Sequence, residues 1–359
     1  MAALDDDTRN LAPEEVLRRI GTVRDRLGED LVILGHHYQR DEVIRFADIT
    51  GDSLKLSQFA ASRSAARWVV FCGVHFMAES ADILRSPHQR VILPNPAAGC
   101  SMADMAQLPQ VRACWELLDA GLPGRTVPVV YVNSSAEVKA FAGERGGIAC
   151  TSSNAAKVVE HALGLGERVL FLPDQHLGRY SGSRAGVPLE RMPVWDPAAP
   201  PRGAGWDPFR TAALILWKGH CSVHQMFKNT HVTHFRNTEP DRRIIVHPEC
   251  AWEVTAAADE AGSTEAILRR VSETAPGTRW AVGTELNMVR RLASRYPQGT
   301  VVPLTRFGSV CPTMWRIDPR CLLQALDRLA AGDPVNVVSV PAAIAGPARL
   351  ALDRMLSLA

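Results

Sequence analysis

Short apolar runs alternate with segments of helical character along most of the chain. Runs such as LVILG (31–35), WVVF (68–71) and VPVVYV (127–132) are rich in Val and Ile and are the length of single strands. Each run is followed by a polar turn and then by a segment in which apolar residues recur at helical spacing. Buried strands that alternate with helices are typical of parallel α/β/α units. The pattern therefore predicts an α/β protein with short parallel sheets.

The elements repeat three times without a strict sequence period. Each third opens with a strand that runs into polar residues, as in GHHYQ, VNSSAEVK and HPEC. Each third closes with a strand-like run followed by a glycine and then by Cys100, Cys221 or Cys311, which are 221 − 100 = 121 and 311 − 221 = 90 residues apart. We expect three similar α/β/α domains whose strand ends face one central cavity.

Turn-forming and polar segments suggest where these domains begin and end. The boundaries are expected near GLPGR (121–125) and in the polar stretch 229–241. The segment 181–208, rich in Gly, Pro and Arg, is expected to be a long surface insertion in the middle domain. The expected domains are residues 1–121 with an N-terminal helix, 122–240, 241–335, and a helical extension 336–359 that packs back on the first domain.

Length, composition and charge agree with this organisation. A chain of 359 residues is long enough for two or three modules, and 46% hydrophobic with 22% charged residues is typical of a globular protein. Lys and Arg exceed Asp and Glu by only 40 − 38 = 2, so no global field attracts nucleic acid or an anionic membrane. The N-terminus lacks the apolar core of a signal peptide, and no apolar run approaches the length of a membrane span. We expect a cytoplasmic protein.

The eight cysteines leave several interpretations open. In a reducing compartment a cysteine is first of all a small buried hydrophobic residue. Cys100, Cys221 and Cys311 are isolated, one in each third, and none belongs to a CxxC pair, which excludes the zinc-ribbon and bacterial ferredoxin patterns. Three such cysteines suit a metal centre with three protein ligands and one open position, and thiolates favour zinc or iron–sulfur. Spacing alone does not separate this hypothesis from three buried thiols.

Hydroxyl side chains stand at the starts of three predicted helices. Ser53, Ser152 and the pair Ser263 and Thr264 each precede a helical pattern, where a Ser or Thr usually caps the helix. Helix N-termini also bind anions through unsatisfied N–H groups. One such site in each domain would suit a small ligand with several carboxylates or a phosphate.

Candidate acid–base groups follow the first strand of each third. His36 and Tyr38 follow the first strand, Tyr131 and Asn133 end the second, and His247 and Glu249 end the third. A single His in such a place is more often structural, but several polar strand ends together favour a site. His224, three residues after Cys221, is expected to face the same cavity.

About ten unusual segments resemble the quinolinate synthase (quinolinate synthetase A) family, in the same order and over roughly residues 31–320. They are GHHYQRDEVIRFADITGDSLKLS, FCGVHFMAESADIL, PNPAAGCSMADM, VVYVNSSAEVKA, CTSSNA, LPDQHLGR, WKGHCSVH, HPEC, GST, VGTE and CPTMWRI. The resemblance implies three α/β/α domains in a pseudo-threefold arrangement. It also implies a [4Fe–4S] cluster held by three cysteines, with the fourth iron open to the substrate. The implied reaction condenses iminoaspartate with dihydroxyacetone phosphate to give quinolinate, phosphate and water, in the de novo route to NAD.

Carried over residue by residue, the resemblance assigns a role to each candidate. The cluster ligands fall on Cys100, Cys221 and Cys311. Tyr38, Glu249 and His247 take the acid–base roles. The ligand-binding positions are His36, Ser53, Tyr131, Asn133, Ser152, His224, His247, Glu249, Ser263 and Thr264. The other five cysteines receive no role.

The resemblance also bears on partners and on rival functions. It makes a transient contact with the enzyme that produces iminoaspartate a natural expectation, because that imine is unstable. One rival is a zinc-dependent aldolase or lyase acting on a triose phosphate. A second rival is a non-catalytic iron–sulfur sensor, although an electron-transfer cluster normally has four protein ligands.

Overall fold

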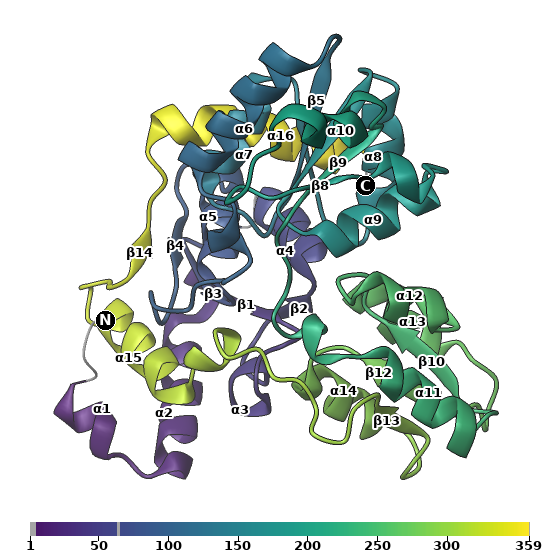
Figure 1. The fold of residues 1–359 in the computed structure, drawn as a ribbon. Coiled ribbons are helices and arrows are strands. Elements are labelled where there is room, and N and C mark those ends of the chain that lie inside the picture. The colour runs from purple at the N-terminus through teal and green to yellow at the C-terminus, as the bar shows by residue number, and fades with distance from the viewer. Residues whose placement is uncertain (1–4, 63–64, 359) are drawn as a thin grey trace. The chain divides into compact units, whose positions relative to one another are not determined.

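The computed structural model describes residues 5–62 and 65–358, which form two compact units. The first unit contains the chain up to Cys100 together with Leu286–Met288 and Val310–Pro341. The second contains Ser101–Glu285, Val289–Ser309 and the C-terminal segment from Ala342. Figure 1 shows the helices and strands of both units.

The first unit is built on one five-stranded sheet. Its strand order is β14-β4-β3-β1-β2, and only β14 is antiparallel to its neighbour. The strands are β1 (Leu31–His36), β2 (Ile49–Gly51), β3 (Trp68–Cys72), β4 (Arg90–Ile92) and β14 (Val337–Val338). The helices are α1 (Asp6–Asn10), α2 (Pro13–Leu27), α3 (Asp41–Ile44), α4 (Ser53–Ala61), α5 (His75–Leu84) and α15 (Pro319–Ala330), with 3₁₀ turns η1 (Gly28–Asp30) and η6 (Met314–Arg316).

The second unit contains two further parallel sheets. The larger has the order β6-β5-β7-β9-β8. Its strands are β5 (Thr126–Tyr131), β6 (Ile148–Cys150), β7 (Arg168–Leu172), β8 (Val194–Trp195) and β9 (Leu214–Trp217). Its helices are α6 (Leu108–Gly121), α7 (Ala136–Glu144), α8 (Ala155–Leu163), α9 (Gln175–Arg184), α10 (Asp207–Arg210) and α16 (Ala342–Ser357), with 3₁₀ turns η2 (Ala103–Met105), η3 (Leu189–Arg191) and η4 (Gly203–Trp206).

The smaller sheet of the second unit has the order β11-β10-β12-β13. Its strands are β10 (Arg243–Val246), β11 (Glu260–Ala261), β12 (Trp280–Gly283) and β13 (Val301–Pro303). Its helices are α11 (Asn229–Thr238), α12 (Trp252–Ala257), α13 (Thr264–Ser272) and α14 (Leu286–Ala293), and the 3₁₀ turn η5 (His224–Met226) precedes α11.

The three sheets share one core topology. In each, the first strand lies between the second on one side and the third on the other. Beyond the third strand comes β4 in the first sheet and β13 in the smallest, whereas in the β5–β9 sheet it is β9, with β8 outside it at the edge. The predicted α/β class with three similar α/β/α domains is therefore confirmed. In such sheets ligands bind beyond the carboxyl ends of the strands, where the chain reverses direction between the first and third strands.

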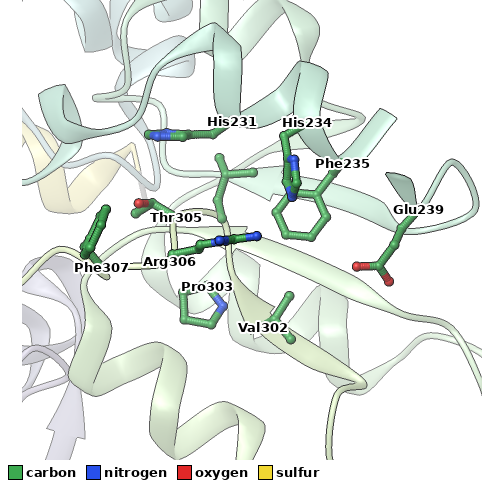
Figure 2. A pocket seen from close by; sticks show the side chains of 10 residues that line it. His231, His234, Phe235, Glu239, Val302, Pro303, Thr305, Arg306 and Phe307 are labelled. Atoms are coloured by element: carbon green, nitrogen blue, oxygen red, sulfur yellow. The ribbon is translucent and has the colours of Figure 1, made fainter. Parts of the chain in front are cut away.

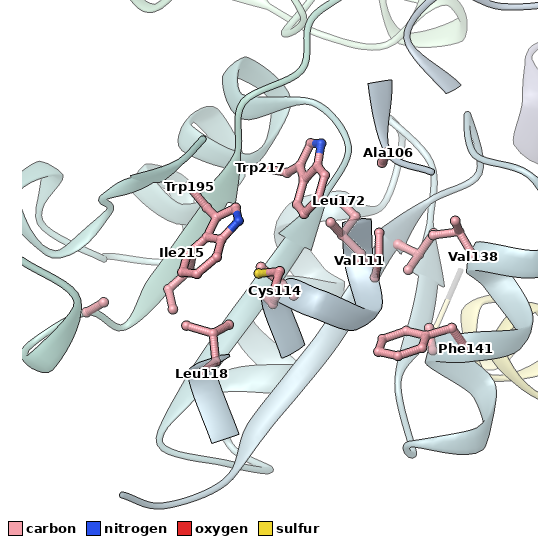
Figure 3. Close-up of a cluster of buried hydrophobic side chains, with 14 of the residues drawn as sticks. Ala106, Val111, Cys114, Leu118, Val138, Phe141, Leu172, Trp195, Ile215 and Trp217 are labelled. Carbon is pink, nitrogen blue, oxygen red and sulfur yellow. The ribbon is translucent and has the colours of Figure 1, made fainter. Parts of the chain in front are cut away.

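The helices placed last in the first and second expected domains belong to the cores of the next sheets. Helix α6 was expected in the first domain, but Val111, Cys114 and Leu118 lie in the core of the β5–β9 sheet (Figure 3). Helix α11 was expected at the end of the second domain, but Val232 and Phe235 pack with β10. An amphipathic pattern shows that a helix has an apolar face, but not which sheet will cover it.

The segment 181–208 also differs from the expected surface insertion. It supplies the edge strand β8, which pairs with β9, and the side chain of Trp195 is buried in the core with Phe209 and Trp217 (Figure 3). The Gly and Pro residues of this segment are typical of a loop, and a strand of two residues is too short to show a hydrophobic period in the sequence.

The C-terminal extension is divided between the two units. Strand β14 pairs with β4 in the sheet of the first unit. Helix α16 instead packs against α7 and β6 of the second unit, and Arg354 donates hydrogen bonds to the carbonyls of Gly143 and Gly147 (Figure 1).

The contact between α7 and α16 depends on a glycine. A Cβ at Gly143 would lie 1.9 Å from the carbonyl oxygen of Pro347 in α16. We expect Gly143→Ala to lower the free energy of unfolding by roughly 1–3 kcal/mol, because the helices would have to separate. Urea denaturation measures this change.

Gly21→Ala is the matched control, because a Cβ at this position in α2 meets nothing within 4 Å. This variant is expected to gain about 0.5–1 kcal/mol from the lower entropy of its unfolded chain. Equal stabilisation by both substitutions would contradict the close approach of α16.

Candidate active site

Glu249 is the centre of a buried polar cluster in the second unit. It follows β10, is only 3% exposed, and its Oε2 lies 2.7 Å from Nδ1 of His224 and 3.6 Å from Nδ1 of His247. The two imidazole rings stack with centroids 4.4 Å apart. A carboxylate and two histidines thus share one small, water-excluded volume.

Backbone and side-chain contacts hold these rings in place. The backbone N–H of Glu249 donates to Nδ1 of His247, so that nitrogen is an acceptor and the neutral ring carries its proton on Nε2. Nε2 of His224 lies 3.1 Å from the hydroxyl of Thr284, which follows β12. The side-chain amide of Gln225 donates to the carbonyl of Glu249, joining the turn after Cys221 to the end of β10.

The charge state of Glu249 is set by its neighbours. Burial alone would raise its pKa, but the two histidines and hydrogen bonds from His224 and Tyr131 outweigh burial and lower the pKa to about 2. The site therefore holds an ionised carboxylate. Burial lowers the pKa of His247 to about 3, with a further contribution from His224, so this ring is neutral at physiological pH.

Asp174 is a second buried carboxyl in this region. It follows β7, caps α9 by accepting from the backbone N–H groups of His176 and Leu177, and is fully buried. Burial and the charge of Glu249 raise the pKa of Asp174 well above its usual value. The pKa values of two acidic groups in one region are thus shifted in opposite directions, which is common in sites that move protons.

Hydroxyl groups from the two sheets of the second unit also meet. The hydroxyl of Ser153 donates to that of Ser263, at 2.9 Å, so the loop that carries Ser152 lies beside the start of α13. Ser263 caps α13 as predicted, by accepting from the N–H of Ala266, and Thr264 is the first residue of that helix. The buried side-chain oxygen of Asn133 has no hydrogen-bond partner among the described residues.

The helix caps predicted at Ser53 and Ser152 are wrong. Asp52, not Ser53, caps α4, and Asn154 is the cap position of α8. Both Asp and Asn are strong N-cap residues, although only the side chain of Asp52 makes the capping hydrogen bond here. The two serine hydroxyls are consequently not used for capping.

The first unit holds the remaining acid–base candidates. His36 ends β1 and is buried, and its ring lies edge-on to Tyr38 with centroids 4.6 Å apart. The backbone N–H of Tyr38 donates to Nδ1 of His36, and the side-chain amide of Asn287 donates to the carbonyl of Tyr38. Ser53 begins α4 after the neighbouring strand β2.

Cys100, Cys221 and Cys311 each begin the same local structure. A 3₁₀ turn starts three residues after each cysteine, at Ala103 (η2), His224 (η5) and Met314 (η6). A helix starts eight residues after each cysteine, at Leu108 (α6), Asn229 (α11) and Pro319 (α15). The threefold repeat in the sequence is therefore most regular in the segments that begin at these cysteines. We call each such segment, from the cysteine to the start of the following helix, a cysteine turn.

Burial divides the eight cysteines into two groups of four. Cys72, Cys114, Cys150 and Cys250 are buried, and burial raises the pKa of each of these thiols, that of Cys72 to about 12. Cys100, Cys221, Cys311 and Cys321 are partly exposed. Burial also raises the pKa of Cys321, to about 11. The burial of Cys72, Cys114, Cys150 and Cys250 fits the packing role that is usual for a cysteine in a reducing compartment.

Cys221 lies close to the acid–base cluster. One ligand atom from each of Cys221, His224 and Glu249 falls within 4.8 Å of the other two. The chain before Cys221 is held by Gly219, whose carbonyl accepts from the N–H of Gln175, and by Met105, whose carbonyl accepts from the ring N–H of Trp217. A Cβ at Gly219 would lie 2.2 Å from the carbonyl of Pro173, so only glycine fits this position.

Asp174 and Thr284 were missed as site residues. Thr284 directly follows the third strand of its sheet and Asp174 comes two residues after the third strand of its own, in the segments VGTE and LPDQHLGR. The third strand borders the point at which the chain reverses direction, so position in the topology was the available signal.

A separate surface pocket lies on the third sheet of the structure, between α11 and the segment after β13 (Figure 2). It has a volume of about 640 Å³ and its lining, among the described residues, includes none of the predicted site residues. The lining is His231, His234, Phe235, Glu239, Val302, Pro303, Leu304, Thr305, Arg306 and Phe307.

These features define an α/β enzyme with titratable side chains after parallel strands and three equivalent cysteine turns. The family model described as "Quinolinate synthetase A protein" matches residues 18–357. The chain belongs to this family of enzymes of NAD biosynthesis.

Curated relatives cover nearly the whole chain. A quinolinate synthase from Acidobacterium capsulatum is 52% identical over 357 residues, which are 98% of this chain and 95% of the relative. Quinolinate synthases from Anoxybacillus flavithermus and a Geobacillus species are 50% and 49% identical, over 98% and 100% of this chain and 95% and 98% of the relatives. No helix in the described part of the chain could span a membrane.

The pH dependence of folding stability tests the charge state of His247. The unfolded chain takes up a proton at this ring below about pH 6.5, whereas the folded ring stays neutral down to about pH 3, so folding stability falls as the pH falls through this window. Between pH 7 and pH 5 the free energy of unfolding should fall in both proteins. We expect the fall to be about 2 kcal/mol smaller in His247→Asn than in the parent protein, because the variant lacks this titrating ring.

Urea denaturation at the two pH values measures this difference. The matched control is His88→Asn, at an exposed position. Identical pH dependence of the parent protein and His247→Asn would contradict a neutral, buried His247.

Proposed function

We propose that the protein condenses iminoaspartate with dihydroxyacetone phosphate to give quinolinate, phosphate and water, using a [4Fe–4S] cluster. Cys100, Cys221 and Cys311 would hold three of its irons, and the fourth would stay open to the substrate. The observation that carries the proposal is the cysteine turn, because three identical local structures present one partly exposed thiol each.

The donor set suits this cluster. Thiolates are the usual protein ligands of iron–sulfur clusters, and three of them leave one iron without a protein ligand. The four buried thiols, whose pKa values are raised by burial, are poor ligands by comparison. When bound, the cluster supplies a Lewis-acidic iron that polarises a hydroxyl or carbonyl oxygen of the substrate.

The proposed ligands for the substrate anions are the hydroxyls near three helix starts. Ser53 and Ser152 are not used as helix caps, and Ser263 and Thr264 begin α13. Each helix is nine residues long and directs unsatisfied N–H groups at its start. These groups suit the two carboxylates of iminoaspartate and the phosphate of the triose, with the unpaired oxygen of Asn133 accepting from the imine or a hydroxyl.

The proposed acid–base groups are Tyr38, His247 and Glu249. Neutral His247 can accept a proton, and ionised Glu249 stabilises the charge that the ring then carries. Tyr38 would donate and recover a proton during tautomerisation and loss of water, with Glu249 as its partner. His36, Tyr131 and His224 would orient these groups and the substrate.

Two further proposals concern the setting of the reaction. The imine substrate is unstable in water, so transfer during a transient contact with the iminoaspartate-producing enzyme would protect it. A cytoplasmic location supplies the reducing conditions that thiolate ligands need.

Anaerobic reconstitution of cysteine variants tests the ligand assignment. With iron and sulfide the parent protein should bind about four irons per chain and absorb broadly in the visible region. Cys100→Ala, Cys221→Ala and Cys311→Ala should each lose most of this iron. Cys321→Ala is the control, since this partly exposed thiol has no proposed role. Full iron content in all three single variants would contradict the assignment.

Turnover of Tyr38→Phe tests the proposed acid–base role. The variant should retain its iron and lose about 100-fold or more in turnover, because the ring remains and only the hydroxyl is removed. Tyr296→Phe, at a partly exposed position with no proposed role, serves as control. Undiminished turnover of Tyr38→Phe would remove Tyr38 from the mechanism.

A further inference from the structure

We propose that Cys221, His224 and Glu249 bind one Zn²⁺ ion in the protein that lacks its iron–sulfur cluster. One ligand atom from each lies within 4.8 Å of the other two, and His224 and Glu249 are already 2.7 Å apart. The residues supply one thiolate, one imidazole and one carboxylate, each of which is a common ligand of zinc.

The observed spacing requires little movement to coordinate the ion. Zinc bonds of about 2.0–2.3 Å in tetrahedral geometry place neighbouring ligand atoms roughly 3.3–3.6 Å apart. His224 and Glu249 would separate by less than about 1 Å as the ion replaces their direct contact. The Cys221 sulfur, which lies within 4.8 Å of the other two ligand atoms, would approach them by at most about 1.5 Å, and the residue is partly exposed.

The surroundings are organised as a zinc site requires. Ligating histidines usually bond through their second nitrogen to a neighbouring polar group, which fixes the ring. Nε2 of His224 already contacts the hydroxyl of Thr284, which leaves Nδ1 directed at Glu249. Gln225 holds the backbone of Glu249, and His247 stacks against His224, so both rings are fixed before the ion arrives.

The charges balance when zinc binds. Glu249 is ionised, and the Cys221 thiol loses its proton to solvent as the sulfur binds the ion. One negative carboxylate and one thiolate then neutralise the Zn²⁺ charge, and water can take the fourth position. Three protein ligands with one open position are typical of exchangeable or catalytic zinc rather than of closed structural sites.

Zinc and the cluster would compete, because both need the Cys221 sulfur. This consequence rests on the proposed function only in taking Cys221 as a cluster ligand. The two sites share no other protein ligand, since the cluster would use Cys100 and Cys311 whereas zinc would use His224 and Glu249. The two sets of ligands make the metals distinguishable by mutation.

Zinc titration of cluster-free protein tests the site. Protein stripped of iron and zinc is titrated with Zn²⁺ in competition with a chromophoric chelator, and one ion per chain is expected. Cys221→Ala, His224→Ala and Glu249→Gln should each weaken zinc binding about tenfold or more, whereas Cys100→Ala and Cys311→Ala should not. Thermal melting in the absence of metal shows which variants remain folded.

Thr284→Val and Cys321→Ala provide graded controls. Thr284→Val removes only the hydroxyl beside His224 and should lower the affinity for zinc about tenfold. Cys321→Ala should leave the affinity for zinc unchanged. Equal loss of zinc in Cys100→Ala or Cys311→Ala would show that zinc occupies the three-cysteine position, and would overturn the proposal. Absence of tight zinc binding in the folded parent protein would also overturn it.

Reconstitution of the zinc-loaded protein tests the competition separately. Iron uptake should fall at least tenfold when zinc is bound and should recover after zinc is removed with a chelator. Full iron uptake with zinc retained would contradict competition. Failure of the zinc-free protein to assemble any cluster would count against the proposed function. The zinc affinities of the single variants would still show whether Cys221, His224 and Glu249 bind zinc.

Discussion

The buried negative charge of Glu249 is the constraint around which the second unit is arranged. Moving a carboxylate out of water is costly unless hydrogen bonds and opposite charge compensate for the loss of solvation. Two histidines and a tyrosine hydroxyl supply the compensation and lower the pKa of Glu249 to about 2. Burial raises the pKa of Asp174, and the charge of Glu249 raises it further.

These interactions explain why side chains from several elements converge. His224 comes from a cysteine turn, His247 and Glu249 follow the first strand of the third sheet, and Thr284 follows its third strand. Each of these residues lies within three residues of the end of a parallel strand or of Cys221. The carboxyl edge of a parallel sheet can assemble such a group because all its strands end on the same side.

The sequence predicted the elements better than their partners. Apolar runs and polar strand ends were sufficient for the three similar sheets and for most candidate residues. The amphipathic pattern of α6 could not show that Val111 and Cys114 would be buried by the second sheet rather than the first. Likewise, a two-residue strand such as β8 has no periodicity, and only the buried ring of Trp195 reveals its place in the core.

Within the candidate site, residue types were easier to predict than contacts. His224, His247 and Glu249 were identified as chemistry-bearing residues, but their mutual distances depend on how two segments far apart in sequence pack together. Ser53 and Ser152 have residue types that favour helix caps, but Asp52 and Asn154 have the same preference and occupy those positions. Asp174 and Thr284 became recognisable only once the strand order placed them at the reversal of the chain.

The most direct measurement is product formation by anaerobically reconstituted protein supplied with iminoaspartate and dihydroxyacetone phosphate. The account predicts that quinolinate and inorganic phosphate appear in equal amounts, and that both require the iron-loaded protein. Iron-loaded protein that releases no quinolinate, or releases phosphate without quinolinate, would contradict it.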